Sequence, residues 1–181
     1  MRVYKTKIKG LILFKPHIFK DHRGSFTEIF NKKLTFNLGI KENFVQDNIS
    51  YSKKNVLRGL HLQTKNSQEK FVSVIKGKIL DVVIDLRKKS QTFGKNFQII
   101  LSEKNAKSIL IPSGCAHGFL GLDNENIVVY SNNNYRSKKS EIGLLWNDPK
   151  LKIKWPRKKL IISKKDKNNL KFIDFCRKYK I

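Results

Sequence analysis

The fold is decided by a stretch of β-forming residues that one glycine interrupts: Phe71-Val72-Ser73-Val74-Ile75-Lys76-Gly77-Lys78-Ile79-Leu80-Asp81-Val82-Val83-Ile84-Asp85-Leu86. β-Branched residues dominate both apolar runs, and each run has the length of a strand. Gly77 between two lysines is a turn signal. The pattern therefore predicts a β-hairpin in a mainly β protein.

Similar short segments continue on both sides of this predicted hairpin. Short segments that contain apolar and aromatic residues are separated by turn signals. The segments expected to be strands are 11–14, 25–30, 43–50, 97–101, 108–111, 116–122 and 127–131. A single helical turn is expected at 34–38. Short strands at this spacing are typical of a sandwich or a barrel.

The end of the chain changes character after Asp148-Pro149 and Trp155-Pro156. Ser163 is a suitable N-cap for a helix over 164–178. This helix would carry an apolar stripe at helical spacing, formed by Phe172, Phe175, Cys176 and Tyr179, with Ile173 beside it. Such a stripe is more typical of a packing surface than of a ligand site. We expect one domain over residues 1–181, with a barrel core at about 20–150 and a helical tail at about 157–181.

The charge of the chain is strongly basic, with 39 Lys and Arg against 14 Asp and Glu and a net charge of +25. Such a charge is compatible with a nucleic-acid-binding protein, which remains an alternative. However, the lysines are dispersed in pairs, and the basic runs 87–89 and 157–159 lie far apart. A dispersed positive field is expected to attract a small anionic substrate.

The sequence contains no targeting or membrane signal that we can identify. No apolar run approaches the roughly 18 residues of a membrane-spanning helix, and the N-terminal region does not resemble a signal peptide. The two cysteines, Cys115 and Cys176, form neither a disulfide framework nor a zinc-binding spacing. Free thiols fit a reducing compartment, so we expect a cytoplasmic protein.

Candidate functional residues gather in two neighbouring β-patterned segments. Their sequences are Gln46-Asp47-Asn48-Ile49-Ser50-Tyr51-Ser52 and Val56-Leu57-Arg58-Gly59-Leu60-His61-Leu62-Gln63. A histidine can act as a base at neutral pH, and an arginine can bind anions. Amide side chains lie nearby, and Pro112-Ser113-Gly114-Cys115-Ala116-His117-Gly118-Phe119 and Tyr130 are candidate partners. Together they suggest proton chemistry on an anionic, sugar-like substrate.

Gly59-x-His61-x-Gln63 and Pro112-x-Gly114-x-x-His117 resemble the two motifs of the cupin superfamily, whose fold is a jelly-roll barrel. Metal-binding cupins normally carry a second histidine where this chain has Gln63. A metal site could still use His61, Glu69 and His117. Two alternatives therefore remain beside proton chemistry: a metal-dependent cupin, and two histidines that are simply buried and hydrogen-bonded.

More of the chain resembles the dTDP-4-dehydrorhamnose 3,5-epimerase family. The matching segments, in order from about residue 20 to 166, are Asp21-x-Arg23-Gly24-x-Phe26-x-Glu28, Gln46-Asp47-Asn48-x-Ser50, Leu57-Arg58-Gly59-Leu60-His61-x-Gln63, Gln68-x-Lys70, Gly77-x-x-x-Asp81-Val82-x-x-Asp85-Leu86-Arg87, Ser90-x-Thr92-Phe93-Gly94, Ala116-His117-Gly118-Phe119, Tyr130, Trp146-Asn147-Asp148-Pro149, Trp155-Pro156 and Asp166. The resemblance implies a mainly β, cupin-type jelly roll with a short helical C-terminal tail, and a cofactor-free epimerase of dTDP-rhamnose and polysaccharide biosynthesis.

The resemblance also assigns the chemical roles. It makes His61 the base that removes a proton next to a ketone, and Asp166 the carboxylate that orients this histidine. Lys70 is expected to stabilise the negative charge that develops on the C4 oxygen. Tyr130 is expected to return a proton on the opposite face. Asp81 and Asp85 are expected to be structural.

Substrate-binding positions follow from the same resemblance. Those expected to contact the nucleotide sugar are Arg23, Glu28, Gln46, Asp47, Asn48, Arg58, His117, Glu141 and Lys165. No metal is implied. The resemblance also implies a homodimer whose N-terminal strands are exchanged, so that some binding residues cross the interface.

The chain departs from the family pattern in Asn134-Tyr135-Arg136. The family often places a tyrosine against the nucleobase here, and by spacing Arg136 occupies that position. Arginine can also stack on a base. The nucleobase, the exact 4-keto sugar (a GDP-linked heptose is one alternative) and double or single epimerisation therefore stay open.

Overall fold

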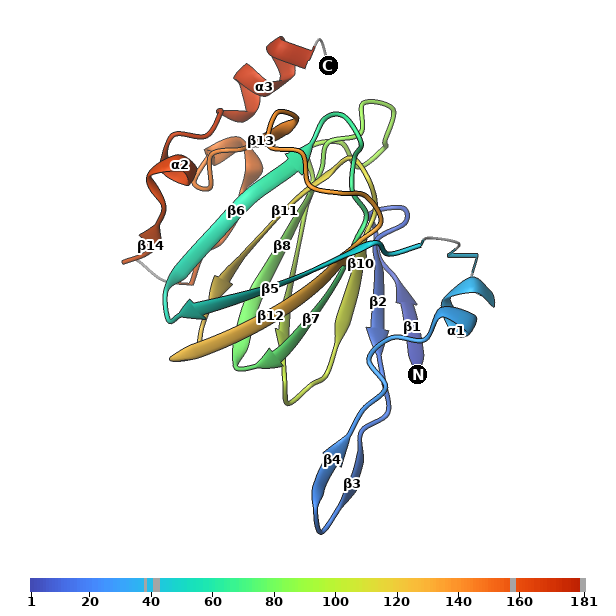
Figure 1. Ribbon diagram of the computed structural model, residues 1–181. Coiled ribbons are helices and arrows are strands. Elements are labelled where there is room, and N and C mark those ends of the chain that lie inside the picture. Colours follow the sequence, from blue (N-terminus) through green and yellow to red (C-terminus); the bar gives the residue numbers. More distant parts are fainter. Residues whose placement is uncertain (38, 41–42, 157–158, 180–181) are drawn as a thin grey trace.

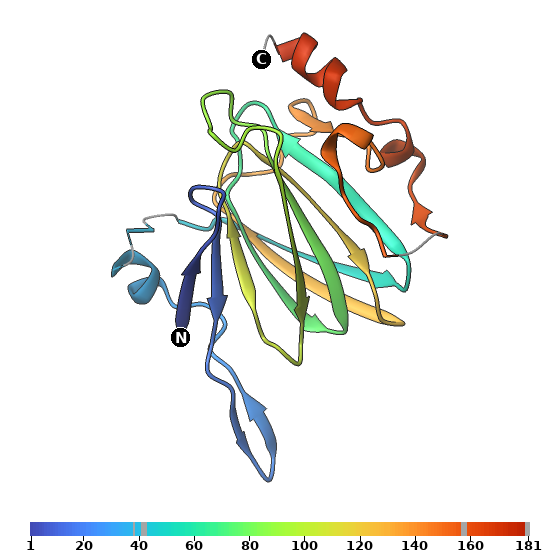
Figure 2. The ribbon, with the colours of Figure 1, turned by 180° about the vertical axis from the view of Figure 1, so that it is seen from behind.

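Two antiparallel β-sheets face each other in the structure, a computed structural model that describes residues 1–37, 39–40, 43–156 and 159–179 (Figures 1 and 2). The first sheet contains, in spatial order, β1 (Arg2–Lys5), β2 (Ile12–Lys15), β10 (Ser108–Ile111), β7 (Lys70–Lys76), β12 (Glu125–Asn132) and β5 (Gln46–Lys53). The second contains β13 (Glu141–Gly143), β6 (Val56–Gln63), β11 (Cys115–Gly121), β8 (Lys78–Asp85) and β9 (Asn96–Ser102), with β14 (Ile161–Ile162) parallel to β6. The predicted mainly β architecture is confirmed.

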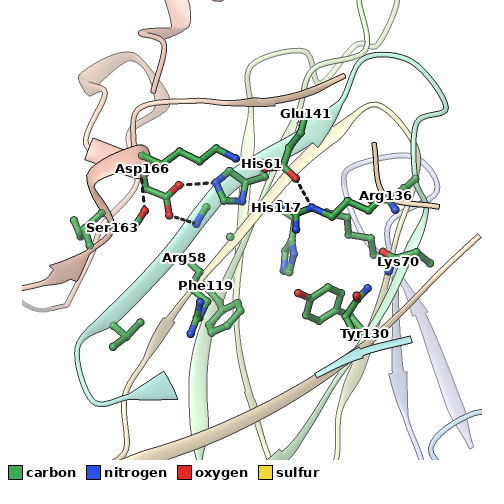
Figure 3. A pocket seen from close by; sticks show the side chains of 18 of the residues that line it. Arg58, His61, Lys70, His117, Phe119, Tyr130, Arg136, Glu141, Ser163 and Asp166 are labelled. Carbon is green, nitrogen blue, oxygen red and sulfur yellow. Dashed lines mark hydrogen bonds and ion pairs between the residues drawn. The ribbon is translucent and has the colours of Figure 1, made fainter. Parts of the chain in front are cut away.

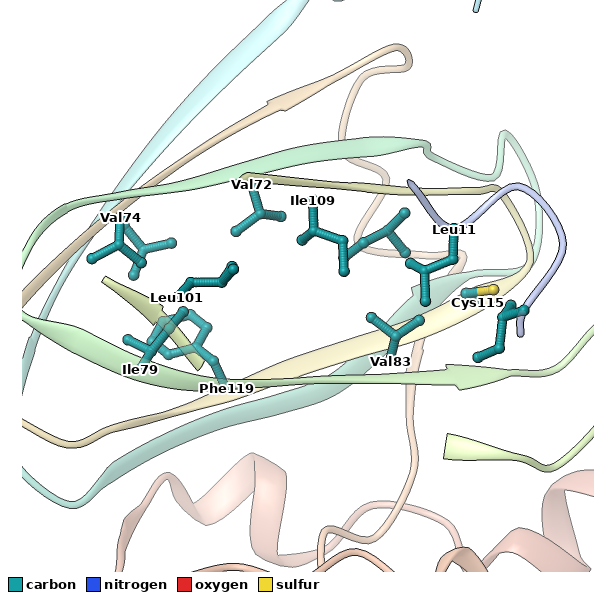
Figure 4. Close-up of a cluster of buried hydrophobic side chains, with 12 residues drawn as sticks. Leu11, Val72, Val74, Ile79, Val83, Leu101, Ile109, Cys115 and Phe119 are labelled. Atoms are coloured by element: carbon teal, nitrogen blue, oxygen red, sulfur yellow. The ribbon is translucent and has the colours of Figure 1, made fainter. Parts of the chain in front are cut away.

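The space between the two sheets is filled by apolar side chains from both (Figure 4). Val72 and Ile109 come from the first sheet, and Ile79, Val83 and Phe119 come from the second. All five are at most 5% exposed, so the cluster excludes water from this part of the interior. Burial of such side chains is the main stabilising contribution to the sandwich.

The hairpin predicted around Gly77 is wrong, because β7 and β8 lie in opposite sheets. β7 pairs with β10 and β12, whereas β8 pairs with β9 and β11. The reason is that β8 is apolar on both faces: Ile79 and Val83 face the central cluster, and Leu80 and Val82 belong to a second cluster. Such a strand needs cover on both faces, which the centre of the second sheet provides.

The C-terminal segment provides the outer cover of the second sheet, and Figure 1 shows it packed beside β6. It contains the 3₁₀ helix η1 (Pro149–Leu151), α2 (Lys164–Lys167) and α3 (Phe172–Tyr179). The single helix expected over 164–178 is therefore wrong. Leu170 interrupts it by forming a bridge with Leu144, and the Asp148 carboxylate then accepts a hydrogen bond from the Phe172 backbone N–H at 2.6 Å. The predicted apolar stripe does pack against the sheet.

The N-terminal region contains a small hairpin that stands away from the two sheets (Figure 1). It consists of β3 (Phe19–Asp21) and β4 (Gly24–Phe26), so the strand expected over 25–30 is much shorter than predicted. The strand expected over 43–50 begins only at Gln46. A short helix, α1 (Lys32–Asn37), matches the expected turn at 34–38, although Leu38 lies outside the described residues. No described helix is both long and apolar enough to cross a membrane.

Gly77 provides a test of the crossing between sheets. Its φ is +78°, and a Cβ placed there would lie 2.1 Å from the Glu125 carbonyl oxygen. Gly39 is a matched control, because its φ is +79° but nothing lies within 4 Å of the same position. We expect Gly39→Ala to cost about 1 kcal/mol for the left-handed backbone. Gly77→Ala should cost about 2 kcal/mol more because of overpacking. Denaturant unfolding measures both, and equal losses would contradict the close approach.

Candidate active site

A cavity of about 530 Å³ lies between the two sheets and contains most of the predicted site residues (Figure 3). One wall comes from β5, β7 and β12 of the first sheet, and the opposite wall comes from β6 and β11 of the second. The segment with β14 and α2 lines the cavity as well. Phe119 and Tyr130 line the cavity and also contact the central apolar cluster, so that cluster forms the floor.

Strand register places the polar residues of the first wall in rows. Asn132 of the middle strand β12 is opposite Gln46 of β5 on one side and opposite Lys70 of β7 on the other. One step along, Asn48 is opposite Tyr130. Side chains alternate between the faces of a sheet, so all five point toward the second sheet. The amides and the two chemically active groups therefore share one surface.

A β-bulge sets the second wall. His61 of β6 is opposite His117 of β11, and Arg58 is opposite Phe119. Between these two pairs β6 advances by three residues, whereas β11 advances by only two. The extra residue in β6 brings Arg58 and His61 to the same face. At the bulge Gly59 has a φ of +107°, and a Cβ there would lie 2.6 Å from both the Gly118 Cα and the His117 carbonyl oxygen. Only glycine allows this approach of the two strands.

His61 is held by a carboxylate from the C-terminal segment. Its Nε2 lies 2.6 Å from Asp166 Oδ1, and Asp166 is 6% exposed, whereas 28% of the His61 side chain is exposed. Burial raises the pKa of Asp166, but the hydrogen bond and charge of His61, the Gly59 N–H and Ser163 together lower it below its usual value. An ionised Asp166 requires a proton on His61 Nε2, which leaves Nδ1 as the basic nitrogen of the neutral ring.

The other histidine of this cavity wall, His117, is also paired with a carboxylate, which comes from β8. His117 Nε2 is 2.7 Å from Asp81 Oδ2, and both side chains are buried, at 7% and 0% exposure. The other Asp81 oxygen is buried without a hydrogen-bond partner among the described residues. Sequence reasoning treated Asp81 as structural. A carboxylate between apolar residues of a central strand was the signal that it has a specific partner.

Lys70 and Tyr130 both have pKa values that burial changes. Burial lowers the pKa of Lys70 to about 8, while the charges of Glu141 and Asp81 oppose that change. Burial also raises the pKa of Tyr130, and the nearby Arg58 and Arg136 oppose it. At neutral pH Lys70 is therefore mostly a cation and Tyr130 a neutral phenol that can donate a proton.

Glu141 and Lys165, both predicted as substrate-binding residues, lie at the edge of the cavity and contact each other. Glu141 accepts hydrogen bonds from Arg136 Nε at 2.9 Å and from Lys165 Nζ. Burial raises the pKa of Glu141, but these two partners lower it to about 2. Arg58 donates from Nε to Ser52 Oγ at 2.9 Å. The cavity thus contains oriented cations suited to an anionic ligand.

Three predicted binding residues lie away from this cavity. Arg23 is on the small hairpin, where it pairs with Asp21 and is 79% exposed. Glu28 is exposed and accepts a hydrogen bond from Asn31. Asp47 is on the outer face of β5, because Gln46 and Asn48 on either side of it point inward. Within one chain the structure does not bring these three to the site.

Gln63, which replaces the second cupin histidine, is buried and bound to the backbone. Its amide donates to the carbonyls of Asn66 and Tyr135, and its oxygen accepts from the Ser137 N–H at 2.6 Å. Among the described residues no group of three or more His, Cys, Asp or Glu side chains could hold a metal ion. The metal-binding alternative therefore has no ligand set in this part of the chain.

Some cavity residues were not predicted from the sequence. Asn132 and Ser163 line the cavity, and Arg136 was expected only as a stacking position. Ser163 was expected as an N-cap, and its Oγ does accept a hydrogen bond from the Asp166 N–H at 3.0 Å. Strand alternation from Tyr130 would have placed Asn132 in the same row.

Comparisons with known proteins match nearly the whole chain to one family. Residues 5–174 match the family model described as dTDP-4-dehydrorhamnose 3,5-epimerase. The enzyme of that name from Shigella flexneri is 46% identical over 96% of this chain and 97% of its own length; that from Methanothermobacter thermautotrophicus is 44% identical over 92% of each. A crystal structure of the Bacillus anthracis enzyme with TDP and PPi bound is 42% identical, covers 94% of this chain and 99% of its own, and has a TM-score of 0.92. The crystal structure of the Legionella pneumophila enzyme in complex with dTDP-4-keto-L-rhamnose is 40% identical in sequence. It covers 93% of this chain and 90% of its own, with a TM-score of 0.90.

Proposed function

This chain belongs to the dTDP-4-dehydrorhamnose 3,5-epimerase family, a group of isomerases with a cupin-type jelly-roll fold, and we propose the roles of its own residues in that reaction. The activity is epimerisation at C3 and C5 of dTDP-4-dehydro-6-deoxy-D-glucose to dTDP-4-dehydro-L-rhamnose, in dTDP-rhamnose biosynthesis. One observation supports these roles most strongly: His61 and Tyr130 lie on opposite walls of one cavity. Lys70 lies on β7, which pairs with the strand that carries Tyr130.

His61 is the base of the proposed mechanism. A carbon-bound proton next to the C4 ketone is weakly acidic, so its removal needs a positioned base and a stabilised enolate. Asp166 fixes the ring through Nε2 and stabilises the imidazolium that forms. His61 Nδ1 is then the atom that accepts the proton from C5 and, in a second cycle, from C3.

Lys70 stabilises the enolate in this scheme. Lys70 is half-buried, and its ammonium has no hydrogen-bond partner among the described residues, so it is available to the C4 oxygen. In a water-poor site a positive charge next to a developing oxyanion lowers the barrier strongly. Asp81, whose charge raises the pKa of Lys70, helps to keep the ammonium protonated.

Tyr130 returns the proton from the other wall. Deprotonation by His61 and reprotonation by Tyr130 occur on opposite faces of the planar enolate, and this inverts the carbon. The raised pKa of Tyr130 keeps the phenol protonated at neutral pH. Arg58 and Arg136 lower the cost of the transient phenolate, because their charges favour the ionised form.

The reaction in deuterated water tests the function directly. The enzyme incubated with dTDP-4-keto-6-deoxy-glucose should place deuterium at both C3 and C5, which NMR of the product detects. His61→Asn should abolish label at both carbons. Label at a single carbon would make the protein a mono-epimerase. The absence of label would contradict the activity on this substrate, and GDP-linked 4-keto sugars would then be assayed.

The pKa of Lys70 predicts the alkaline side of the pH–rate profile. Below about pH 8 Lys70 is charged, and as the pH rises through that value it loses its proton. Turnover should therefore fall above about pH 8. Lys70→Arg keeps the charge at high pH, so this fall should disappear even if the rate is lower. Lys76→Arg, at an exposed position outside the cavity, is the control and should leave the fall in place. The same alkaline fall in Lys70→Arg would contradict the role.

Asp81 and Asp85 form a matched pair of fully buried carboxylates on β8. Asp81→Asn should lower kcat/KM about 10-fold, because His117 loses its charged partner. It should also move the alkaline fall to lower pH, because Asp81 raises the pKa of Lys70. Asp85 instead binds Arg87, Ser90 and Thr92. Asp85→Asn should cost about 2 kcal/mol of stability and leave the pH profile unchanged. An unchanged profile in Asp81→Asn would contradict its effect on Lys70.

We also propose a homodimer in which the small hairpin of one protomer reaches the cavity of its partner. The hairpin stands away from its own sheets (Figure 2). It exposes Phe19 and Phe26, at 57% and 69%, and Arg23 is also exposed there. Large exposed apolar side chains next to a charge are typical of a surface that another protein covers. Arg23 and Glu28 would then complete the substrate site in trans.

Complementation between two inactive variants tests this dimer. Arg23→Gln and His61→Asn should each have low activity. After they are unfolded together and refolded as a mixture, about a quarter of the sites should be intact, because each mixed dimer has one site with both native residues. No recovery of activity, or a monomer in sedimentation, would contradict the exchange.

A cytoplasmic location remains part of the proposal, and the two free thiols are consistent with it.

A further inference from the structure

The backbone around Arg136 is fixed at the cavity by three glutamine side chains. The Arg136 N–H donates to Gln46 Oε1 at 2.9 Å, and the next N–H, of Ser137, donates to Gln63 Oε1 at 2.6 Å. The Gln68 amide donates to the Asn134 carbonyl at 2.7 Å. Because Gln46 and Gln63 lie in opposite sheets, this segment bridges the two walls. A binding group placed here loses little entropy when a ligand binds.

The guanidinium of Arg136 is also oriented, and part of it is unused. Its Nε donates to Glu141 Oε2 at 2.9 Å (Figure 3). The other Glu141 oxygen accepts a hydrogen bond from Lys165. Glu141 remains ionised above about pH 2, as its lowered pKa shows. Among the described residues the two terminal nitrogens of Arg136 have no hydrogen-bond partner, and the side chain is about half exposed, at 53%.

Arg58 is held in the same manner on the other side of Tyr130. Its Nε donates to Ser52 Oγ at 2.9 Å, and one terminal nitrogen donates to the Tyr51 carbonyl at 3.0 Å. Both arginines line the cavity, and the charges of both act on Tyr130. The cavity therefore contains two guanidinium groups, each anchored through Nε. Each has at least one terminal nitrogen that makes no hydrogen bond to the residues that the structure describes.

On the basis of the proposed function, we propose that Arg136 binds the diphosphate of the nucleotide sugar, as a second anion-binding residue together with Arg58. A guanidinium edge with two parallel N–H groups matches the geometry of phosphate oxygens. A diphosphate has two charged groups, and one arginine can satisfy only part of them. Glu141 keeps the plane of Arg136 fixed, and with Lys165 present the three side chains still have one net positive charge.

Substitution of Arg136 tests this assignment. Arg136→Gln should weaken binding of dTDP about 10-fold or more in calorimetry, because charge-assisted hydrogen bonds are lost. It should raise KM more than it lowers kcat. Arg177→Gln is the charge-matched control, since Arg177 is 76% exposed on α3 and is not part of the cavity; it should bind dTDP like the wild type.

Inorganic pyrophosphate separates a phosphate contact from a nucleobase contact. It should compete with dTDP for the wild-type protein, and Arg136→Gln should weaken pyrophosphate and dTDP by the same factor. If only dTDP is weakened, Arg136 contacts the base, and the assignment is overturned. Unchanged dTDP binding in Arg136→Gln, or no competition by pyrophosphate in the wild type, would also overturn it. Wild-type turnover is measured in parallel: a wild type that binds dTDP without epimerising the sugar contradicts the proposed function alone.

Discussion

The close contact of β6 with β11 at two glycines is the constraint on which the active site depends. Gly59 and Gly118 let the two backbones approach to a distance that excludes any Cβ. The bulge at this point turns both Arg58 and His61 toward the cavity. It also brings the Gly59 N–H to 3.4 Å from the Asp166 carboxylate. One backbone feature therefore orients the base and assists the group that holds it.

The two walls differ in how they hold their functional groups, and this difference suits an inversion. The histidines of the second sheet are each bound to a buried carboxylate, which fixes their ring orientation. In the described part of the chain, Lys70 and Tyr130 of the first sheet have no such carboxylate partner, and burial is the main influence on their pKa values. A base must be positioned before it can remove a proton, whereas the groups that meet the enolate act most strongly in a site of low dielectric constant. The apolar floor between the sheets supplies that environment.

The sequence predicted the mainly β architecture and a short helical tail better than it predicted how the elements connect. It also selected four residues that line one cavity, His61, Lys70, Tyr130 and Asp166, whose chemical roles stay a prediction. Gly77 is compatible with a hairpin or with a crossing between sheets, and only the burial of both faces of β8 decides between them. The helix expected over 164–178 is interrupted because Leu170 and Asp148 make tertiary contacts that local propensity does not contain. The partner of Asp81 was likewise missed, since His117 lies 36 positions away and becomes its neighbour only through the β8–β11 register.

The charge of the protein has a different meaning at the surface and in the cavity. Over the whole chain the net charge is +25, and exposed lysines separated by more than a Debye length of about 8 Å act nearly independently in physiological salt. In the cavity Glu141 and Asp166 balance part of the positive charge, and each is bound to a specific cation or imidazole. Removal of these carboxylates would increase the positive charge of the site but would leave the cations without a fixed orientation. The geometry of the substrate site therefore depends on its anions as much as on its cations, although the substrate itself is an anion.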